Sequence, residues 1–250
     1  EEAVEAEFMA ATDGGASTVR ETLGIGMSGN PALTYTTNVV FRCKDFAKLH
    51  DKGDGYRFIF IGPEGTWLTI VAIDGRDRFR MSIVGSPQKI THSEDDIRAA
   101  LLRAMGKPFD YEIQSVMRWV RRELVADRYG TKRIFIVGDA AHLNNPLGAF
   151  GLNGGIQDSA NLTDKLGRVC RGEGEESLLD LYERQRRTVN LEFVQEYSIR
   201  NFKRLAAKTP EERQANIDDL RRTANDREAR RQFMRVSTMI ASMQRANAIV

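Results

Sequence analysis

The spacing of apolar residues predicts mainly strands in the first third of the chain. Residues 5–12 alternate between apolar and polar side chains up to Asp13 and Gly14, which predicts a strand, a turn and then a short helix over 16–20. From residue 34 to residue 85 the period is two. The strands predicted in that stretch are 35–42, 56–61, 66–73 and 78–84. Polar turns separate the last three, so we expect an antiparallel meander with one packed face and one free face.

A helix and a further strand are predicted after the meander. Ser93 and Asp96 have the spacing of a capping box, which predicts a helix that carries the apolar positions between 97 and 104. Residues 111–120 alternate again and predict a strand. Residues 121–129 then connect this strand to the next element.

One later stretch has a pattern of a different kind. The short apolar run at 134–137 is bounded by charge and glycine, which is typical of a strand buried on both faces. It ends at Gly138 and Asp139, and a glycine-rich turn follows at 146–151. A helix is predicted to begin near Asn153.

The remainder of the chain is predicted to be helical. Thr209 and Glu212 form a capping box with proline at the first helical position. We expect one last helix, with apolar residues on one face that packs on the body of the protein or on a second subunit. These residues are Phe233, Val236, Ile240 and Met243. The arginines at 184, 186 and 187 are expected to form a solvated face.

Composition excludes several classes of protein. The 250 residues suffice for one large or two small domains, and a net charge of +2 gives no indication of a nucleic-acid partner. Two cysteines provide neither a disulfide framework nor the spacing of a metal site, so we expect a cytoplasmic protein without a bound metal. No apolar run reaches membrane-spanning length, and we expect no signal peptide, because the first residues are acidic and lack an apolar core. Hydrolase and kinase functions have no support, because no Ser-His-Asp order and no Walker loop is found.

Asp139 is the strongest candidate for a contact with a ligand. It follows a buried strand, and in open α/β sheets ligands bind at the carboxyl ends of the strands. Four glycines after it would let the backbone approach a flat ligand closely. They are Gly148, Gly151, Gly154 and Gly155. The next helix start offers unpaired N–H groups and a partial positive charge, which favour an anion. A reduced flavin, with a polyhydroxyl chain and a ring that becomes anionic, fits all three features.

The same residues resemble a known family. The segments GDAAH, P-x-G-x-x-G-x-N and QD-x-x-N-L-x-x-K-L, in this order, resemble the flavin motif of the class A FAD-dependent aromatic hydroxylases, the para-hydroxybenzoate hydroxylase family. The resemblance implies that the Gly138 and Asp139 pair holds the ribityl chain of FAD. It places another group of residues around the isoalloxazine ring, namely Pro146, Gly148, Gly151, Leu152 and Asn153. Asn145 departs from the pattern, because many members have a second proline there.

A second motif lies near the start of the chain. The segment DGGASTVR, from Asp13 to Arg20, resembles the DG motif of the same family. The resemblance implies that Asp13 and Gly14 serve the flavin and the nicotinamide cofactor, and that Arg20 lies toward the nicotinamide nucleotide. On the residues alone, an ordinary Asp-Gly turn before a helix is the alternative.

The resemblance also implies a fold class and domains. It predicts an α/β FAD-binding domain, incomplete at the N-terminus, formed by residues 1–27 and 128–205. An inserted, mainly antiparallel α+β substrate domain then covers 28–127, and C-terminal helices cover 206–250. The G-x-G-x-x-G at residues 24–29 is not a dinucleotide fingerprint, because a helix precedes it and Pro31 follows too soon. We expect it to be a flexible exit from the flavin domain.

The family begins with a strand, a glycine turn and a helix that bind the ADP half of FAD, and none of these precedes Glu1. Without them, the strand at 134–137 would lack its central neighbours, and the pyrophosphate would lack a helix N-terminus. We therefore expect the sequence to be part of a longer protein.

The resemblance implies a flavin-dependent monooxygenase that hydroxylates a small phenolic or aromatic-acid substrate. NADPH or NADH would reduce FAD, and O2 would react through a flavin hydroperoxide. A homodimer is possible. His142 follows the GD motif, but a loop histidine is more often a solvated or hydrogen-bonded bystander, so it is not assigned to the site. The alternatives are a flavin epoxidase or halogenase, and a non-catalytic remnant that serves as a binding or dimerising module.

Overall fold

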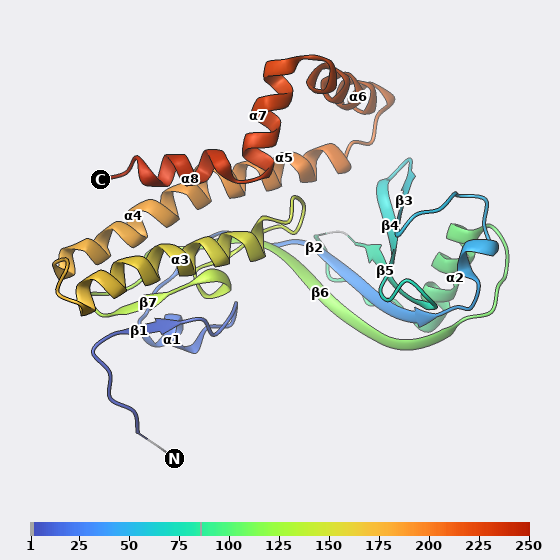
Figure 1. Cartoon of the computed structure of the whole chain (residues 1–250). Coiled ribbons are helices and arrows are strands. Elements are labelled where there is room, and N and C mark those ends of the chain that lie inside the picture. Colours follow the sequence, from blue (N-terminus) through green and yellow to red (C-terminus); the bar gives the residue numbers. More distant parts are fainter. Residues whose placement is uncertain (1–2, 86) are drawn as a thin grey trace. The chain divides into compact units, whose positions relative to one another are not determined.

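The computed structural model describes residues 3–85 and 87–250, and the chain forms two compact units (Figure 1). Unit 1 contains residues 1–31, 122–204 and 214–250, and unit 2 contains residues 32–121 and 205–213. The strands are β1 (Met9–Ala11), β2 (Met27–Arg42), β3 (Arg57–Gly62), β4 (Gly65–Ala72), β5 (Arg78–Val84), β6 (Glu112–Ala126), β7 (Ile134–Ile136) and β8 (His142–Leu143). The α-helices are α1 (Thr18–Thr22), α2 (Glu94–Met105), α3 (Phe150–Cys170), α4 (Asp180–Val189), α5 (Glu196–Leu205), α6 (Pro210–Asn225), α7 (Arg227–Ser237) and α8 (Ile240–Asn247). The short elements are the 3-10 turns η1 (Phe46–Lys48), η2 (Gly138–Ala140) and η3 (Glu176–Leu179), and the π-helical segment η4 (Asn190–Gln195).

Unit 1 has a parallel pair of strands in its core. Strand β1 pairs with β7, with Met9 opposite Ile134 and Ala11 opposite Ile136. The predicted strand at 5–12 is therefore confirmed only at its end, since backbone pairing and not alternation alone makes a strand. The two strands run in the same direction, so the turns that follow them lie at the same edge.

Helices α3 and α4 complete this core. The buried side chains of Leu162 on α3 and Tyr182 on α4 pack with Phe135 and Ile136 of β7. The Tyr182 hydroxyl donates a hydrogen bond to the Ile136 carbonyl at 2.8 Å, so its polar end is paired inside the core. Helix α3 therefore lies against the strand that ends at the GD motif.

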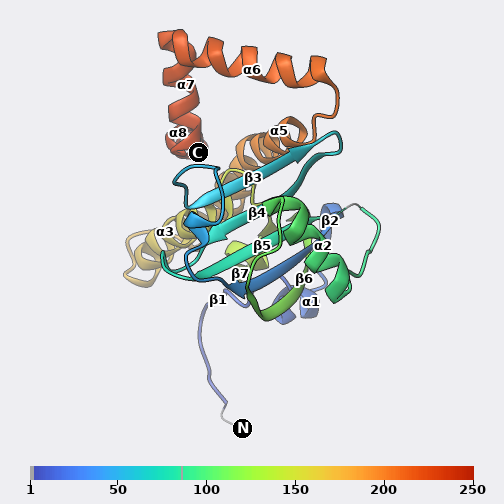
Figure 2. The same ribbon diagram turned by 90° about the vertical axis from the view of Figure 1, so that its right-hand side faces the viewer.

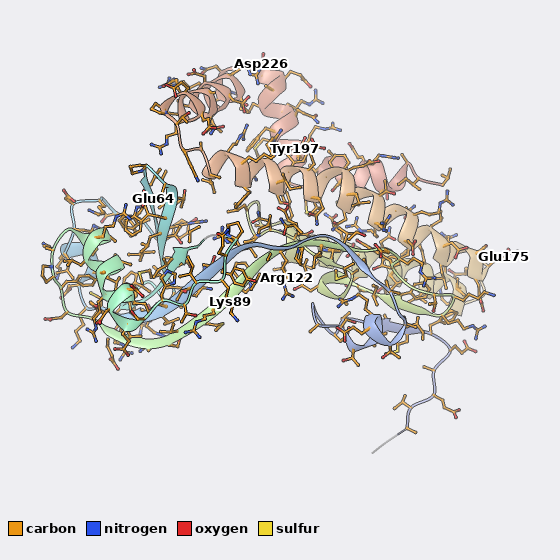
Figure 3. All side chains as sticks on the ribbon, turned by 180° about the vertical axis from the view of Figure 1, so that it is seen from behind. Glu64, Lys89, Arg122, Glu175, Tyr197 and Asp226 are labelled. Carbon is orange, nitrogen blue, oxygen red and sulfur yellow. The ribbon has the colours of Figure 1, made fainter. Side chains whose placement is uncertain are left out.

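Helix α4, segment η4 and helix α5 follow one another without an intervening loop. Segment η4 joins α4 to α5, and Val194 of η4 packs with Phe150 and Met239 in a small second cluster. Tyr197 on α5, labelled in Figure 3, packs against this cluster. The capping box before α6 is confirmed, since the Glu212 carboxylate accepts from the Thr209 N–H and the Thr209 hydroxyl accepts from the Glu212 N–H.

The prediction of one last helix is wrong. Met239 has a φ of 60° and separates α7 from α8. Phe233 and Val236 therefore lie on α7, whereas Ile240 and Met243 lie on α8. Among the four, only Val236 is buried, and the left-handed backbone at Met239 turns the chain in the middle of the helical pattern.

Unit 2 is an antiparallel sheet with one helix on it. Strands β3, β4, β5 and β2 pair in that order, and β6 continues the sheet beside β2. Helix α2 lies over this sheet (Figure 2), and its Ile97 and Leu101 side chains pack with Phe41, Leu68 and Met81. The predicted meander, the Ser93–Asp96 capping box and the helix are confirmed.

The predicted flexible exit at residues 24–29 overlaps a strand in its second half. Strand β2 already begins at Met27. A Cβ on Gly29 would lie 2.1 Å from the Glu123 carbonyl oxygen, so the glycine allows close approach of two backbones. Asp127 binds this segment further, because its carboxylate accepts from the Ser28 hydroxyl at 2.6 Å. Strand β6 is correspondingly longer than predicted and reaches Ala126.

The observed units differ from the predicted domains mainly at the C-terminus. The helices predicted over 206–250 are present, but they do not form a separate body. Residues 214–250 belong to unit 1, and residues 205–213 belong to unit 2.

Candidate functional site

The turns that contain Asp13 and Asp139 lie next to each other in unit 1. Because β1 and β7 are parallel neighbours, Asp13 and Asp139 follow the same ends of adjacent strands. Both carboxylates are exposed. A hydrogen bond from Ser17, and then one from the Val19 N–H at 3.1 Å, lower the pKa of Asp13. Asp139 has no hydrogen-bonding partner in residues 3–85 and 87–250, so its carboxylate is free to accept from a ligand.

Arg20 connects the two turns. Its guanidinium donates from Nη1 to the Ala140 carbonyl at 3.0 Å, and only 7% of the side chain is exposed. The carbonyl belongs to the residue after Asp139. The structure thus places Arg20 as a tie between the DG and GD segments, with most of its side chain inside the protein.

Glycines shape the GD turn from two sides. Gly138 has a φ of 62°, a conformation that favours glycine. A Cβ on Gly155 would lie 3.4 Å from the Gly138 Cα, and a Cβ on Gly154 would lie 3.5 Å from the His142 ring. Gly154 and Gly155 therefore lie where helix α3 contacts the turn, at distances that are ordinary van der Waals contacts, and their predicted role beside a flat ligand stays a prediction.

The glycine-rich loop has one open position. Gly148 has a φ of 128°, and a Cβ there would lie 2.4 Å from the Phe150 ring, so this glycine is required by the loop itself. Around Gly151 no atom lies within 4 Å of a Cβ position. The space next to Gly151 is thus unfilled by the described protein.

Asn145, the departure from the family pattern, holds this loop. It is fully buried, and its amide donates to the Glu123 carboxylate at 3.2 Å. Its side-chain oxygen accepts from the Leu147 N–H at 3.3 Å, which fixes the turn before Pro146 and Gly148. Burial raises the pKa of Glu123, whereas the bond from Asn145 opposes that change.

Helix α3 presents an uncapped N-terminus. It begins at Phe150, three residues before the predicted position, after Ala149 with a φ of 59°. No side chain caps this end, so first-turn N–H groups remain available. Leu152 is 78% exposed and Asn153 is also exposed, so this turn faces away from the core.

A buried ionic cluster lies behind the GD turn. Asp158 on α3 accepts from His142 Nε2 at 2.6 Å and from Arg186 Nε at 2.6 Å. The exposed fractions of the three side chains are 1%, 1% and 4% for Asp158, His142 and Arg186. Of the two alternatives for His142, the structure shows the hydrogen-bonded one and not the solvated one. The prediction of a solvated face is wrong for Arg186, which is buried. The helical spacing of Arg186 with the apolar Tyr182 and Val189 could have revealed its burial.

A separate pocket of about 460 Å³ opens between α3, α4 and α8. None of the predicted site residues lines it. The ammonium of its buried Lys165 already donates to Asn161 and Gln185. This pocket is consequently not the site that the two motifs form.

The site fits a flavin. An exposed carboxylate without a protein partner suits the hydroxyls of a polyol chain, and the open space at Gly151 suits a flat ring beside the backbone. The uncapped start of α3 suits an anion. A metal site is not indicated, since no group of three potential ligand residues occurs in the described ranges. No helix of residues 3–85 and 87–250 has the length and apolar character to cross a membrane.

Comparisons with known proteins agree with this fit. The profile of the FAD binding domain family matches residues 1–197. A putative polyketide hydroxylase of Streptomyces coelicolor is 37% identical over 193 residues, which cover 74% of this chain and 30% of that protein. The tetracenomycin A2 monooxygenase-dioxygenase of Streptomyces glaucescens is 31% identical over 253 residues, which cover 96% of this chain and 41% of that protein. The chain thus spans about a third of the length of the curated relatives it matches.

A solved structure shares the fold. The anhydrotetracycline hydroxylase OxyS of Streptomyces rimosus superposes with a TM-score of 0.74 and is 25% identical; the match covers 93% of this chain and 46% of that one. The α/β class with an antiparallel sheet and C-terminal helices is confirmed. On the match over 197 residues and the shared fold, the chain belongs to the FAD-binding domain family, among the class A FAD-dependent aromatic hydroxylases.

Proposed function

We propose that this chain contributes the ribityl and ring side of an FAD site to a monooxygenase that hydroxylates an aromatic substrate with NADPH or NADH and O2. The observation that carries the proposal is the meeting of the DG and GD turns beside the open helix start. Asp13 and Asp139 lie there on adjacent parallel strands, and helix α3 begins next to Gly151. Relatives named as polyketide and nitrophenol hydroxylating enzymes agree with this reaction class.

In this proposal each residue has a binding or orienting role. Asp139 accepts hydrogen bonds from the ribityl hydroxyls, and Asp13 and Gly14 line the same side of the flavin site. Pro146, Gly148 and Gly151 leave room for the ring, and the N–H groups near Leu152 and Asn153 face its pyrimidine end. Bound FAD supplies redox chemistry and oxygen activation, while the protein supplies position and excludes water.

We further propose that unit 2 is the substrate domain and unit 1 the FAD-binding domain. The antiparallel sheet of unit 2 is inserted between the DG and GD motifs, as in the resembled family. Free Cys43 and Cys170 agree with a reducing, cytoplasmic location. The exposed apolar residues of α7 and α8, such as Phe233 and Met243, are candidates for a homodimer contact.

The decisive experiment is a titration of the purified full-length protein that contains this chain with FAD, followed by flavin fluorescence and by the visible absorption band. We expect saturable binding, then oxidation of NADPH or NADH that a phenol or aromatic acid accelerates, and a hydroxylated product. Absence of FAD binding would favour the alternative, a non-catalytic binding or dimerising module. An epoxide or a halogenated product would identify the other flavoprotein alternatives.

Replacement of Asp139 with alanine is expected to weaken FAD binding about tenfold or more. A hydrogen bond to a charged group contributes roughly 1.5–3 kcal/mol, and the exposed carboxylate makes no hydrogen bond to the residues that the structure describes. Fluorescence titration measures the affinity. Asp164→Ala, which removes an exposed carboxylate from the far part of α3, is the matched control and should leave the affinity unchanged. Equal affinities of both variants would remove Asp139 from the site.

Replacement of Arg20 with methionine tests two roles of this residue. Because its guanidinium binds the Ala140 carbonyl at 3.0 Å, we expect FAD affinity to fall several-fold, together with the rate of flavin reduction. Titration and stopped-flow reduction measure the two quantities. Slower reduction at unchanged FAD affinity would instead support the role toward the nicotinamide nucleotide. Glu21→Gln, an exposed change beside Arg20, serves as control.

A further inference from the structure

A chain of buried and part-buried hydrogen bonds runs from α4 to η4 behind the GD turn. Asp158 accepts from Arg186 and from His142, and the two N···O distances are both 2.6 Å. The other ring nitrogen of His142 lies 2.9 Å from Asn144 Nδ2. Asn144 Oδ1 in turn accepts from Gln195 Nε2 at 2.9 Å. All five residues belong to unit 1.

The directions of these bonds determine the state of the histidine ring. Because Gln195 donates to the oxygen of Asn144, the Asn144 amide presents its NH2 group to His142. An NH2 group can only donate, so Nδ1 of His142 must accept. The single ring proton is then on Nε2, where it is donated to Asp158. His142 is therefore neutral, and the charge of Asp158 is matched by Arg186.

The same carboxylate contacts the turn that presents Asp139. Asp158 Oδ2 lies 3.4 Å from the Gly138 N–H, and Gly138 directly precedes Asp139. Arg186 also donates to the Gly154 carbonyl at 3.4 Å, which ties the first part of α3 to the same cluster. Tyr129 covers the His142 ring in a stacked arrangement, with ring centroids 6.2 Å apart. The cluster thus connects the GD turn, α3, α4 and η4; its Asp158, His142 and Arg186 side chains are buried, whereas Asn144 and Gln195 are half-buried.

We propose that Asp158 and neutral His142 are positioning residues for Asp139, and that the amides of Asn144 and Gln195 select the Nε2–H form of the ring. Asp158 holds the Gly138 N–H, and His142 holds Asp158 in the orientation that this contact needs. The π-helical segment η4 takes part because it directs Gln195 toward Asn144. The expected effect on FAD affinity rests on the proposed function, whereas the protonation state of the His142 ring does not.

The ring state is tested with Asn144→Asp in the purified chain. A carboxylate has no proton to donate, so Nδ1 of His142 must acquire one and the ring becomes a cation between two carboxylates. Nitrogen-15 NMR of the histidine ring distinguishes the forms. We expect one protonated nitrogen, Nε2, in the parent and two in the variant. A parent ring protonated on Nδ1, or a variant ring identical to the parent ring, would overturn the assignment.

The positioning role is tested with Asp158→Asn and with the control Asp164→Asn, an exposed carboxylate on the same helix. Loss of a charged acceptor should weaken FAD binding about tenfold and speed hydrogen exchange at the Gly138 amide, while Asp164→Asn changes neither. Since Asp158→Asn replaces a buried charge and can impair folding, Asn144→Asp is measured alongside it and should also weaken FAD binding. Unchanged FAD affinity in Asn144→Asp, despite a doubly protonated ring, would contradict the proposal.

The two proposals fail in different ways. If the parent chain does not bind FAD, the proposed function fails, and the ring NMR and the exchange of the Gly138 amide still decide whether Asp158 and His142 hold the turn. If the parent binds FAD but Gly138 exchange is the same in all variants, the positioning role fails and the proposed function remains.

Discussion

Replacing Arg186 with methionine is expected to destabilise the folded chain by about 3–5 kcal/mol, because it leaves a buried carboxylate without its cation. Asp158 is 1% exposed, and Arg186 is the charged partner that contacts it. Methionine can fill much of the space of the arginine stem, so the loss arises mainly from the unpaired charge. Chemical denaturation followed by circular dichroism measures the change in the free energy of unfolding.

The destabilisation by Arg186→Met should depend on pH. Burial by itself raises the pKa of Asp158, but its contacts with His142 and Arg186 hold that pKa below the ordinary value. In the parent, the stabilisation that comes from this lowered pKa is present above the pKa of an unfolded aspartate, about 3.9. It is lost as the pH falls through the pKa of Asp158 in the folded protein. In the variant, burial raises the pKa, so the penalty is full at neutral pH and is relieved as the carboxyl becomes protonated. The difference between the two proteins should therefore narrow from pH 7 toward pH 4.

Arg184→Met is the matched control for this prediction. Arg184 lies two residues earlier on α4, is exposed, and contacts the Val250 carbonyl at the surface. We expect a change of about 0.5 kcal/mol or less for this variant. Equal effects at positions 184 and 186, or a penalty at 186 that does not vary with pH, would show that the ion pair is not the cause.

Replacing Gly151 with valine is expected to weaken FAD binding by about tenfold to a hundredfold while leaving the fold intact. Among the described residues, no atom outside the adjoining helix backbone lies within 4 Å of a Cβ at Gly151, so the added Cβ has open space. A flat ring in that space would be displaced, and overpacking of this kind costs about 1–3 kcal/mol. In protein that retains FAD, the midpoint potential should become more negative, because the N–H groups at the start of α3 would stabilise the reduced anion less.

The control for Gly151→Val is Gly167→Val on the same helix. A Cβ at Gly167 meets only the end of the flexible Arg171 side chain at 3.0 Å, which can move aside. Both variants replace a glycine of helix α3 with valine, but only position 151 lies at the start of the helix. An unchanged potential with full FAD occupancy in Gly151→Val would show that the loop does not lie against the flavin.

Local patterns predicted most of the elements of this protein. The alternation at 78–84 and the capping box at Ser93 and Asp96 each depend on neighbours within a few residues, and both have the predicted position. Errors occur where a distant contact or a backbone conformation outweighs the pattern. Gly29 sits in a strand because β6 approaches it, and Met239 breaks a helical period through a left-handed φ.

The sequence by itself determined which residues are candidates for the flavin site, because the DG and GD motifs are ordered, specific and local. It also determined the alternating and helical stretches, since these depend on side-chain period. Only the tertiary structure decided that Arg20 joins the two turns, that Gly154 and Gly155 lie against the GD turn and the His142 ring, and that His142 is buried with a partner on α3. These contacts join residues 12 to 120 positions apart, and burial and pairing depend on what surrounds a side chain in space.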